Sequence, residues 1–204
     1  MREERLAIGA PPRVLEAVLW LPDGQPRGGA VVCHPHPEYG GDMQVGVVVA
    51  VARALVERGV AALRFNFGGV GRSGGRYDGG RAEQGDTAAA VEAMAARLGP
   101  DGPLALVGYS FGAWVAALAA PGLPRVGRVV AVAPPLAFFD WRTLDRLGLP
   151  MGVVVGDRDQ LCPADRLEAL RDLVVVTTLE GADHLLAGYE ARAAEAVCAH
   201  LGVA

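Results

Sequence analysis

The chain has 204 residues, of which 51% are hydrophobic and 21% are charged, a composition that excludes intrinsic disorder. Its net charge of −4, with no clustered basic face, argues against nucleic acid as a partner. No segment approaches the roughly 18 consecutive apolar residues of a membrane span, so we expect no membrane partner. The first five residues lack the apolar core of a signal peptide, which predicts a cytoplasmic protein.

Neither a metal site nor a cofactor is expected. The three cysteines, Cys33, Cys162 and Cys198, contain no C-x-x-C pair, and their odd number leaves one unpaired in any disulfide scheme. Cys33 and Cys198 fall in apolar patterns and are expected to be reduced core residues. His34 and His36 are flanked by prolines that prevent the i, i+4 spacing of helical metal ligands, and no cluster of carboxylates accompanies them.

Short apolar runs alternate with longer helical patterns along the chain. We predict strands at 14–21, 30–33, 60–65, 104–107, 128–133, 152–155 and 174–179. Helices are predicted at 44–57, 81–98, 113–120, 164–171 and 188–201, with a glycine-rich loop at 68–80. This alternation predicts an α/β fold in which helices cover both faces of a twisted, mostly parallel central sheet. No linker or internal repeat interrupts residues 1–204, so we expect a single domain.

The stretch Gly108-Tyr109-Ser110-Phe111-Gly112 lies between a predicted strand and a predicted helix. A G-x-S-x-G sequence in this position predicts a nucleophile elbow, a tight turn that lifts the serine hydroxyl above the sheet. Its two glycines let the strand and the helix approach closely. The helix directs unpaired N–H groups and its positive dipole end toward the serine, where an oxyanion would form.

Acidic residues and a histidine follow two later predicted strands. Asp157 and Asp159 follow one of these strands, and His184 follows the next. Loops at the carboxyl ends of parallel strands line one crevice, so these side chains can converge on Ser110. The chain order of serine, aspartate and histidine is that of the α/β-hydrolases. We favour Asp159 as the acid, because Asp157 directly follows the strand and can instead cap a turn or pair with an arginine.

These three groups have complementary chemical roles. The hydroxyl of Ser110 is a poor nucleophile until a base removes its proton during attack. An imidazole titrates near neutral pH, so His184 can take that proton and later give it to the leaving group. A buried carboxylate, here Asp159, fixes the imidazole tautomer and stabilises the imidazolium cation. The pattern therefore predicts nucleophilic catalysis at an acyl carbon.

Two backbone amides are predicted to form the oxyanion hole. The first is the N–H group of Phe111, directly after the serine. The second should come from the loop after the strand at 30–33, where the sequence is His34-Pro35-His36-Pro37. Pro35 and Pro37 lack a backbone N–H group, so among the three residues that follow His34 only His36 can donate a backbone hydrogen bond.

Four aromatic residues are candidates for substrate binding: Tyr39, Phe138, Phe139 and Trp141. The last three follow the strand at 128–133 and would line an acyl pocket beside the serine. Packing of the same three rings within a short helix after that strand is an equally good interpretation.

Three motifs carry a family resemblance. They are His34-Pro35-His36-Pro37 with Gly40-Gly41, Arg64-Phe65-Asn66-Phe67 with Gly69-Val70-Gly71 and Ser73, and the G-x-S-x-G stretch. With these motifs the chain resembles the small, capless bacterial serine α/β-hydrolases of the dienelactone-hydrolase-like group. The resemblance covers nearly the whole length and implies a Ser-Asp-His hydrolase acting on esters. Dienelactone hydrolases proper use a cysteine nucleophile, so Ser110 argues against that specific activity.

Four other residues complete the sequence-based expectations. Gly68 stands where members of this group usually carry arginine, and Val45 where asparagine is common, so we expect changes in loop packing or substrate contacts there. His200 is expected at the surface or as a partner of a helix dipole, and Ser73 is expected in a turn.

The connection after the strand at 128–133 is short. Many α/β-hydrolases insert a cap domain at this point, but only 17 residues, 134–150, precede the next predicted strand. They leave room for a loop and one short helix. We therefore expect no cap domain and an open or lightly covered site.

The leading interpretation is a serine hydrolase that cleaves carboxylic esters of small-to-medium soluble substrates through an acyl-enzyme. A thioesterase or a peptidase would use the same triad. A non-catalytic binding protein on this fold would usually lack one triad member, whereas candidates for all three are present here. The expected partner is a small-molecule ester or acyl compound. The sequence leaves the oligomeric state open, with a homodimer as one alternative.

Overall fold

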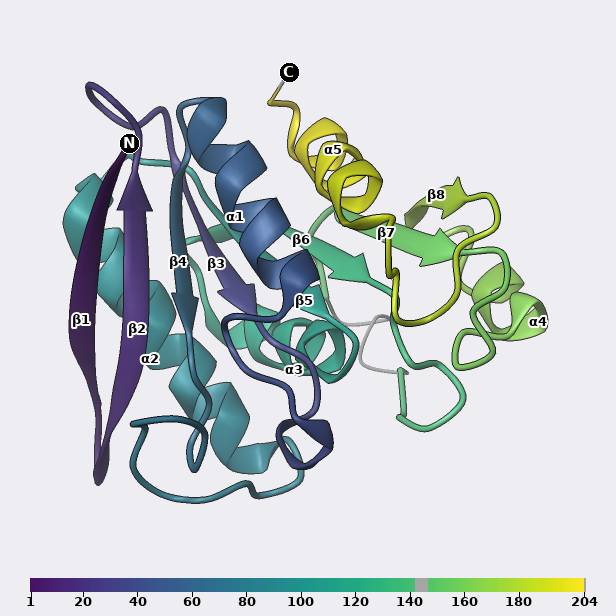
Figure 1. Ribbon diagram of the computed structural model, residues 1–204, viewed down its shortest axis with the longest axis horizontal. Coiled ribbons are helices and arrows are strands. Elements are labelled where there is room, and N and C mark those ends of the chain that lie inside the picture. The colour runs from purple at the N-terminus through teal and green to yellow at the C-terminus, as the bar shows by residue number, and fades with distance from the viewer. Residues whose placement is uncertain (142–146, 204) are drawn as a thin grey trace.

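The computed structural model describes residues 1–141 and 147–203, and within them eight strands form one mixed sheet. The strands are β1 Arg2–Ala10, β2 Arg13–Leu21, β3 Gly29–Cys33, β4 Ala61–Phe65, β5 Leu104–Tyr109, β6 Val126–Val132, β7 Met151–Gly156 and β8 Val175–Leu179. Their spatial order is β1-β2-β4-β3-β5-β6-β7-β8 (Figure 1). The pairs β1–β2 and β2–β4 are antiparallel, and the remaining pairs are parallel. The predicted α/β fold with a mostly parallel sheet is confirmed.

Helices cover both faces of the sheet (Figure 1). They are α1 Gly46–Glu57, α2 Arg81–Leu98, α3 Phe111–Ala119, α4 Ala164–Glu168 and α5 Glu190–Leu201, with short 3-10 helices η1 Pro37–Tyr39 and η2 Ala120–Gly122. α1 and α5 pack on one face, and α2 and α3 pack on the other. Strand β5 serves both cores, because successive residues of a strand point to opposite faces. Leu104 and Leu106 pack in the core with α2 and α3, whereas Ala105 and Val107 pack in the core with α1 and α5.

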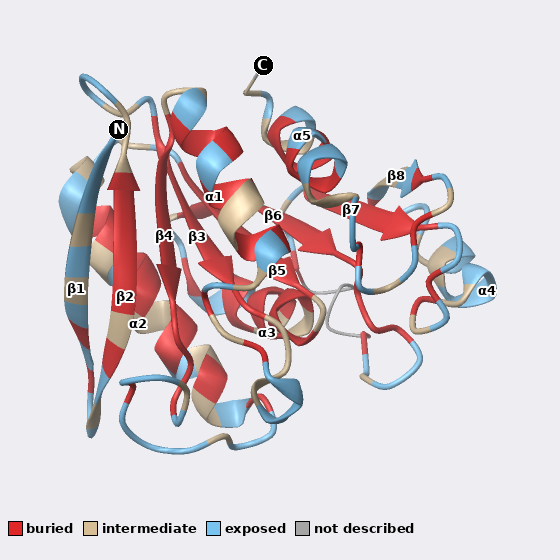
Figure 2. Cartoon of the chain, viewed as in Figure 1, coloured by how far each residue is buried: buried red, intermediate tan, exposed pale blue. Residues whose placement is uncertain are grey.

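The central strands are buried on both faces, whereas strand β1 lies at the exposed edge of the sheet (Figure 2). Every residue of β3, β4, β5 and β7 is buried, as expected for strands covered by helices on both sides. Most of β1 is exposed or only partly buried. A strand at 2–10 was not predicted from the sequence; its charged residues at 2–5 suit an edge strand that faces solvent.

The connection between β6 and β7 adds no cap domain to the fold. Its described residues, 133–141 and 147–150, contain turns and neither helix nor strand. The short helix predicted within 134–150 falls partly on 142–146, which lie outside the described residues. Helix α4 ends at Glu168, three residues earlier than the predicted end at 171. Across the described part of the chain, every helix is too short or too polar to span a bilayer.

The candidate catalytic side chains follow strands that lie together in the sheet. Strands β3, β5, β6, β7 and β8 are adjacent in that order and parallel. Their carboxyl ends therefore meet at one edge, which is where α/β sheets bind their ligands. The segment of His34 and His36 follows β3, Ser110 follows β5, Asp159 follows β7, and His184 follows β8.

Candidate active site

Ser110 has a strained backbone between β5 and α3. Its φ of 54° and ψ of −119° lie in a region that costs a non-glycine residue about 1–3 kcal/mol. The surrounding backbone holds this conformation: the amide of Ser110 donates to the carbonyl of Val132 at 2.8 Å, and its carbonyl accepts from the amide of Ala113 at 2.9 Å. A Cβ atom at Gly108 would lie 2.2 Å from the carbonyl oxygen of Gly112, so this approach of strand and helix requires glycine.

Ser110, His184 and Asp159 form a continuous chain of hydrogen bonds. The Oγ atom of Ser110 lies 2.9 Å from Nε2 of His184, and Nδ1 of His184 lies 3.0 and 2.9 Å from the two carboxylate oxygens of Asp159. A carboxylate only accepts hydrogen bonds, so Nδ1 carries the proton and Nε2 is free to accept from the serine hydroxyl. The side chain of Asp159 is fully buried. This arrangement is the one required of a nucleophile, a base and an orienting acid.

Neighbouring groups hold the acid and the base in place. The amide of Leu161 donates to Oδ1 of Asp159 at 2.9 Å. The hydroxyl of Tyr109 donates to the carbonyl of His184 at 3.0 Å and fixes the loop after β8. Burial raises the pKa of Tyr109 to about 12, so its hydroxyl remains a donor at neutral pH. No role for Tyr109 was predicted from the sequence, since a tyrosine at the end of a buried strand is usually a core residue.

Asp157 is not hydrogen bonded to the histidine. Its carboxylate accepts the amide of Gly181 at 2.7 Å and joins the loops that follow β7 and β8. This contact agrees with the prediction that Asp157 caps a turn. The carboxylate hydrogen bonded to the imidazole is that of Asp159.

The two amides predicted for the oxyanion hole are free to donate. Among the described residues, neither the N–H group of His36 nor that of Phe111 has a hydrogen-bond acceptor. Phe111 is the first residue of α3, where backbone amides have no partner within the helix and the helix dipole favours negative charge. His36 precedes the short helix η1 in the loop after β3.

His34 is a fully buried histidine held by backbone groups on both ring nitrogens. The amide of Phe67 donates to Nε2 at 3.0 Å, so in the neutral ring the proton is on Nδ1, which donates to the carbonyl of Pro35 at 2.6 Å. Burial lowers the pKa of His34 to about 4, which keeps the ring neutral at physiological pH. His34 therefore connects the loop after β3 to the end of β4.

A cavity of about 340 Å³ lies beside Ser110. Its lining consists of His36, Tyr39, Ser110, Phe111, Pro135, Phe138, Phe139 and Leu161. Among the described residues no Asp, Glu, Lys or Arg side chain lines it. Tyr39 and Phe138 are 87% and 69% exposed, so they form the rim of the opening. Such apolar concavities with a few polar groups are typical of small-molecule sites.

Trp141 does not line this cavity, so of the two interpretations of its ring, packing agrees with the structure and substrate binding does not. Its side chain is buried in the core and borders a separate depression with Leu136 and Leu170.

His200 lies in the last turn of α5, one of the two places expected for it, and Ser73 lies in a turn, as expected, with its amide donating to the carbonyl of Val70 at 2.9 Å. Both also make contacts that the sequence did not predict. The Nε2 atom of His200 lies 3.0 Å from the hydroxyl of Thr177, and its ring is half-buried against β7 and β8. Ser73 is buried: its hydroxyl donates to the carbonyl of Asn66 at 2.7 Å and accepts the amide of Glu16 at 2.9 Å. It therefore joins the loop after β4 to strand β2.

The two departures from the family pattern lie outside the triad. The amide of Gly68 donates to the buried carboxylate of Asp86 at 2.9 Å, and Arg13 from β2 forms an ion pair with the same carboxylate at 2.6 Å. The guanidinium group next to position 68 is therefore that of Arg13, from strand β2. Val45 is the N-cap residue of α1, and its side chain makes no capping hydrogen bond.

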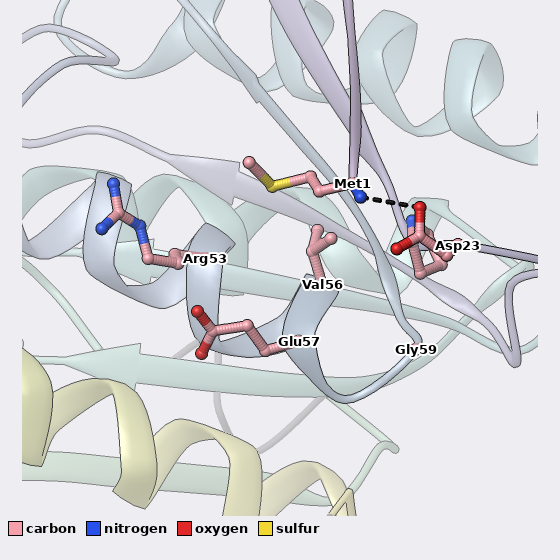
Figure 3. Close-up of a pocket in the computed structure, with 7 residues that line it drawn as sticks. Met1, Asp23, Arg53, Val56, Glu57 and Gly59 are labelled. Carbon is pink, nitrogen blue, oxygen red and sulfur yellow. Dashed lines mark hydrogen bonds and ion pairs between the residues drawn. The ribbon is translucent and has the colours of Figure 1, made fainter.

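A larger depression of about 530 Å³ lies away from the triad (Figure 3). It lies between α1 and the start of the chain and is lined by Met1, Pro22, Asp23, Arg53, Val56, Glu57 and Gly59. The N-terminal amine pairs there with Asp23 at 2.7 Å. This depression offers no nucleophile with an adjacent base, so its size alone does not make it the functional site.

Thiol and metal chemistry have little support in the described part of the chain. There, no group of three or more His, Cys, Asp or Glu side chains is placed to hold a metal ion. Cys33, Cys162 and Cys198 are buried and free, and burial raises the pKa of Cys33 and of Cys162 to about 12. A thiol in that state is a poor nucleophile.

Comparison with known proteins places this chain in a family. The family of the alpha/beta hydrolase domain matches residues 30–197, a segment that includes the elbow and all three triad candidates. The chain belongs to the alpha/beta hydrolase family. The expected membership is thereby confirmed.

Solved structures of other alpha/beta hydrolases agree with this assignment. A serine hydrolase homologue from Coxiella burnetii is 32% identical with a TM-score of 0.87, over 98% of both chains. A serine hydrolase without a lid from Xanthomonas campestris is 29% identical with a TM-score of 0.89, over 99% of this chain and 94% of that one. An uncharacterised protein of Rickettsia prowazekii is 34% identical over 144 residues, which are 69% of this chain and 60% of that protein. The chain thus spans less than two thirds of that relative's length.

We expect Gly112→Ala to destabilise this hydrolase. A Cβ atom there would lie 2.5 Å from the carbonyl oxygens of both Cys33 and His34, so the end of β3 would have to move. The free energy of unfolding in urea should fall by about 1–3 kcal/mol. The control Gly85→Ala, on α2 with no described atom within 4 Å of the new methyl group, should be neutral or stabilising by up to about 1 kcal/mol. Equal stability of Gly112→Ala and the wild type would contradict the close packing.

The buried ring of His34 should make stability depend on pH. Its pKa is about 4 in the folded state and about 6.5 when exposed, so the unfolded chain binds more protons between these values. This contribution to stability is complete above about pH 6.5 and is lost as the pH falls toward 4, by about 3 kcal/mol in total. The free energies of unfolding of the wild type and of His34→Gln, measured in urea from about pH 4 to 6.5, isolate the contribution of this histidine. Parallel pH profiles for the two proteins would refute the assignment.

Proposed function

We propose that this alpha/beta hydrolase cleaves carboxylic esters by covalent catalysis through Ser110, His184 and Asp159. The observation that carries the proposal is the 2.9 Å contact between Oγ of Ser110 and Nε2 of His184, with the serine on a strained turn at the carboxyl end of β5. A non-catalytic member of the fold would have no need to keep the nucleophile, the base and the acid in hydrogen-bond contact.

The chemistry proceeds in two half-reactions. As Oγ of Ser110 attacks the ester carbonyl carbon, Nε2 of His184 takes the hydroxyl proton, and Asp159 stabilises the imidazolium through Nδ1. The carbonyl oxygen becomes an oxyanion that the amides of His36 and Phe111 stabilise. When the intermediate collapses, the bond to the alcohol oxygen breaks and the alcohol leaves with the proton from His184. Water then attacks the acyl-serine by the same steps and releases the carboxylic acid and free Ser110.

The cavity beside the serine favours an uncharged, apolar acyl group of small to medium size. Aromatic rings of Tyr39, Phe111, Phe138 and Phe139 make up much of its lining, which would bury apolar surface of the substrate. A carboxylate placed there would lose its hydration without gaining a cationic partner among the described lining residues. The open rim at Tyr39 and Phe138 leaves space for the alcohol part of the ester.

We expect Ser110→Ala to lower kcat for p-nitrophenyl butyrate by about 10⁴-fold or more, because the nucleophile is lost. Asp159→Asn should lower kcat by about 10⁴-fold, because the wrong imidazole tautomer is favoured. The matched control is Asp157→Asn, which keeps an oxygen to accept the amide of Gly181 and should retain wild-type kcat. Equal losses in the two asparagine variants, or hydrolysis by Ser110→Ala at the wild-type rate, would sink the proposal.

A charged acyl group should be a poor substrate. We expect kcat/KM for the p-nitrophenyl monoester of succinic acid to be at least about 100-fold below that for p-nitrophenyl butyrate, because desolvation of the carboxylate is uncompensated. The p-nitrophenyl ester of monomethyl succinate differs from the charged ester by one methyl group, which removes the charge. It should recover most of the loss in kcat/KM. Comparable kcat/KM values for the charged and neutral succinates would show that the acyl group does not occupy this cavity.

A further inference from the structure

The two oxyanion amides are held by different means. The peptide that carries the N–H group of Phe111 has its carbonyl on Ser110, and that carbonyl accepts the amide of Ala113 at 2.9 Å within the first turn of α3. The helix therefore fixes the orientation of this donor. The N–H group of His36 lies outside regular structure, before η1, and needs another constraint.

The imidazole of His34 supplies that constraint. The carbonyl of Pro35 and the amide of His36 belong to one planar peptide unit, which is trans, so fixing the oxygen fixes the opposite direction of the N–H bond. Nδ1 of His34 donates to this oxygen at 2.6 Å. The ring itself cannot turn without losing the hydrogen bond from the amide of Phe67, and it is fully buried.

The side chain of His36 braces the same loop from the other side. Its Nδ1 atom accepts the amide of Glu38 at 3.2 Å, and its Nε2 atom lies 3.0 Å from the hydroxyl of Tyr77. The backbone after Tyr77 is anchored in turn, because the fully buried carboxylate of Glu83 accepts the amides of Asp78 and Gly80 at 2.9 and 2.7 Å. These hydrogen bonds thus link the start of α2, through Tyr77, to the ring of His36.

We propose that His34 is a positioning residue that aims the His36 amide into the oxyanion hole, with the contact between Tyr77 and the His36 ring as a second brace. The inference rests on the proposed hydrolysis of esters. Neither His34 nor Tyr77 lines the cavity beside Ser110, so both act on the reaction through the backbone of the loop.

Two substitutions of His34 separate its two hydrogen bonds. The amide nitrogen of asparagine takes the place of Nδ1 and can still donate to Pro35, whereas the amide of glutamine reaches the place of Nε2 and can still accept from Phe67. We expect His34→Gln to lower kcat by about 10²–10³-fold, the loss typical of one oxyanion donor, with little change in KM. His34→Asn should retain most of kcat.

A trifluoromethyl ketone tests positioning apart from substrate binding, since its adduct with Ser110 carries an oxyanion. The affinity of His34→Gln for this inhibitor should fall in parallel with kcat, as expected for a transition-state analogue. Titration of active sites with a fluorophosphonate and thermal unfolding verify that the variants are folded. Equal losses in kcat for the asparagine and glutamine variants, or inhibitor affinity unchanged in His34→Gln, would overturn the proposal.

Tyr77→Phe is a milder second variant that keeps the ring and removes the hydroxyl. It should lower kcat and inhibitor affinity by about 3- to 10-fold without changing KM, the effect of one lost neutral hydrogen bond. Should both His34 variants fail to fold, unchanged kcat and inhibitor affinity in Tyr77→Phe would overturn the proposal. The wild type is assayed first: absence of ester hydrolysis there counts against the proposed function, whereas an active wild type with unaffected variants counts against the positioning role alone.

Discussion

The backbone of Ser110 is the constraint on which the proposed active site depends. A serine with φ of 54° is unfavourable by itself, and here it accompanies an approach of β5 and α3 so close that a Cβ atom on Gly108 would lie 2.2 Å from the carbonyl oxygen of Gly112. The turn lifts the hydroxyl to within 2.9 Å of His184 and at the same time leaves the amide of Phe111 unpaired at the start of a helix. The proposed nucleophile and the proposed oxyanion donor are thus products of one local geometry.

The other groups that we propose to be catalytic are held by neighbours to which we assign no chemical role. The amide of Leu161 fixes Asp159, the hydroxyl of Tyr109 fixes the backbone of His184, and the ring of His34 fixes the peptide before His36. The first and third contacts stiffen the loops after β7 and β3, and the second joins the end of β5 to the loop after β8. Such preorganisation is what allows fixed dipoles to stabilise a developing charge without rearrangement during the reaction.

The sequence was most informative where chemistry and spacing act together. The G-x-S-x-G stretch, the order of the triad candidates and the preference for Asp159 over Asp157 all agree with the contacts found, because each rests on local rules of strand ends and turns. These local rules do not predict how a strand or side chain packs against residues that are distant in the sequence. Strand β1 is stabilised by pairing with β2 and by burial of Ile8 and Ala10 in the core, Trp141 is buried in the core, and the ring of His200 contacts Thr177 of β8. The two hydrogen bonds of His34 depend on Phe67 and Pro35, and no local pattern encodes the first of these.

Covalent catalysis by Ser110 is tested most directly by the mass of the protein after reaction with p-nitrophenyl dimethylcarbamate, whose carbamoyl-enzyme hydrolyses slowly enough to accumulate. We expect one dimethylcarbamoyl group per chain, mapped by peptide mass spectrometry to Ser110, and no such adduct in His184→Ala over the same time. An adduct on a different residue that forms as fast as p-nitrophenol is released, with Ser110 unmodified, would contradict the assignment of the nucleophile.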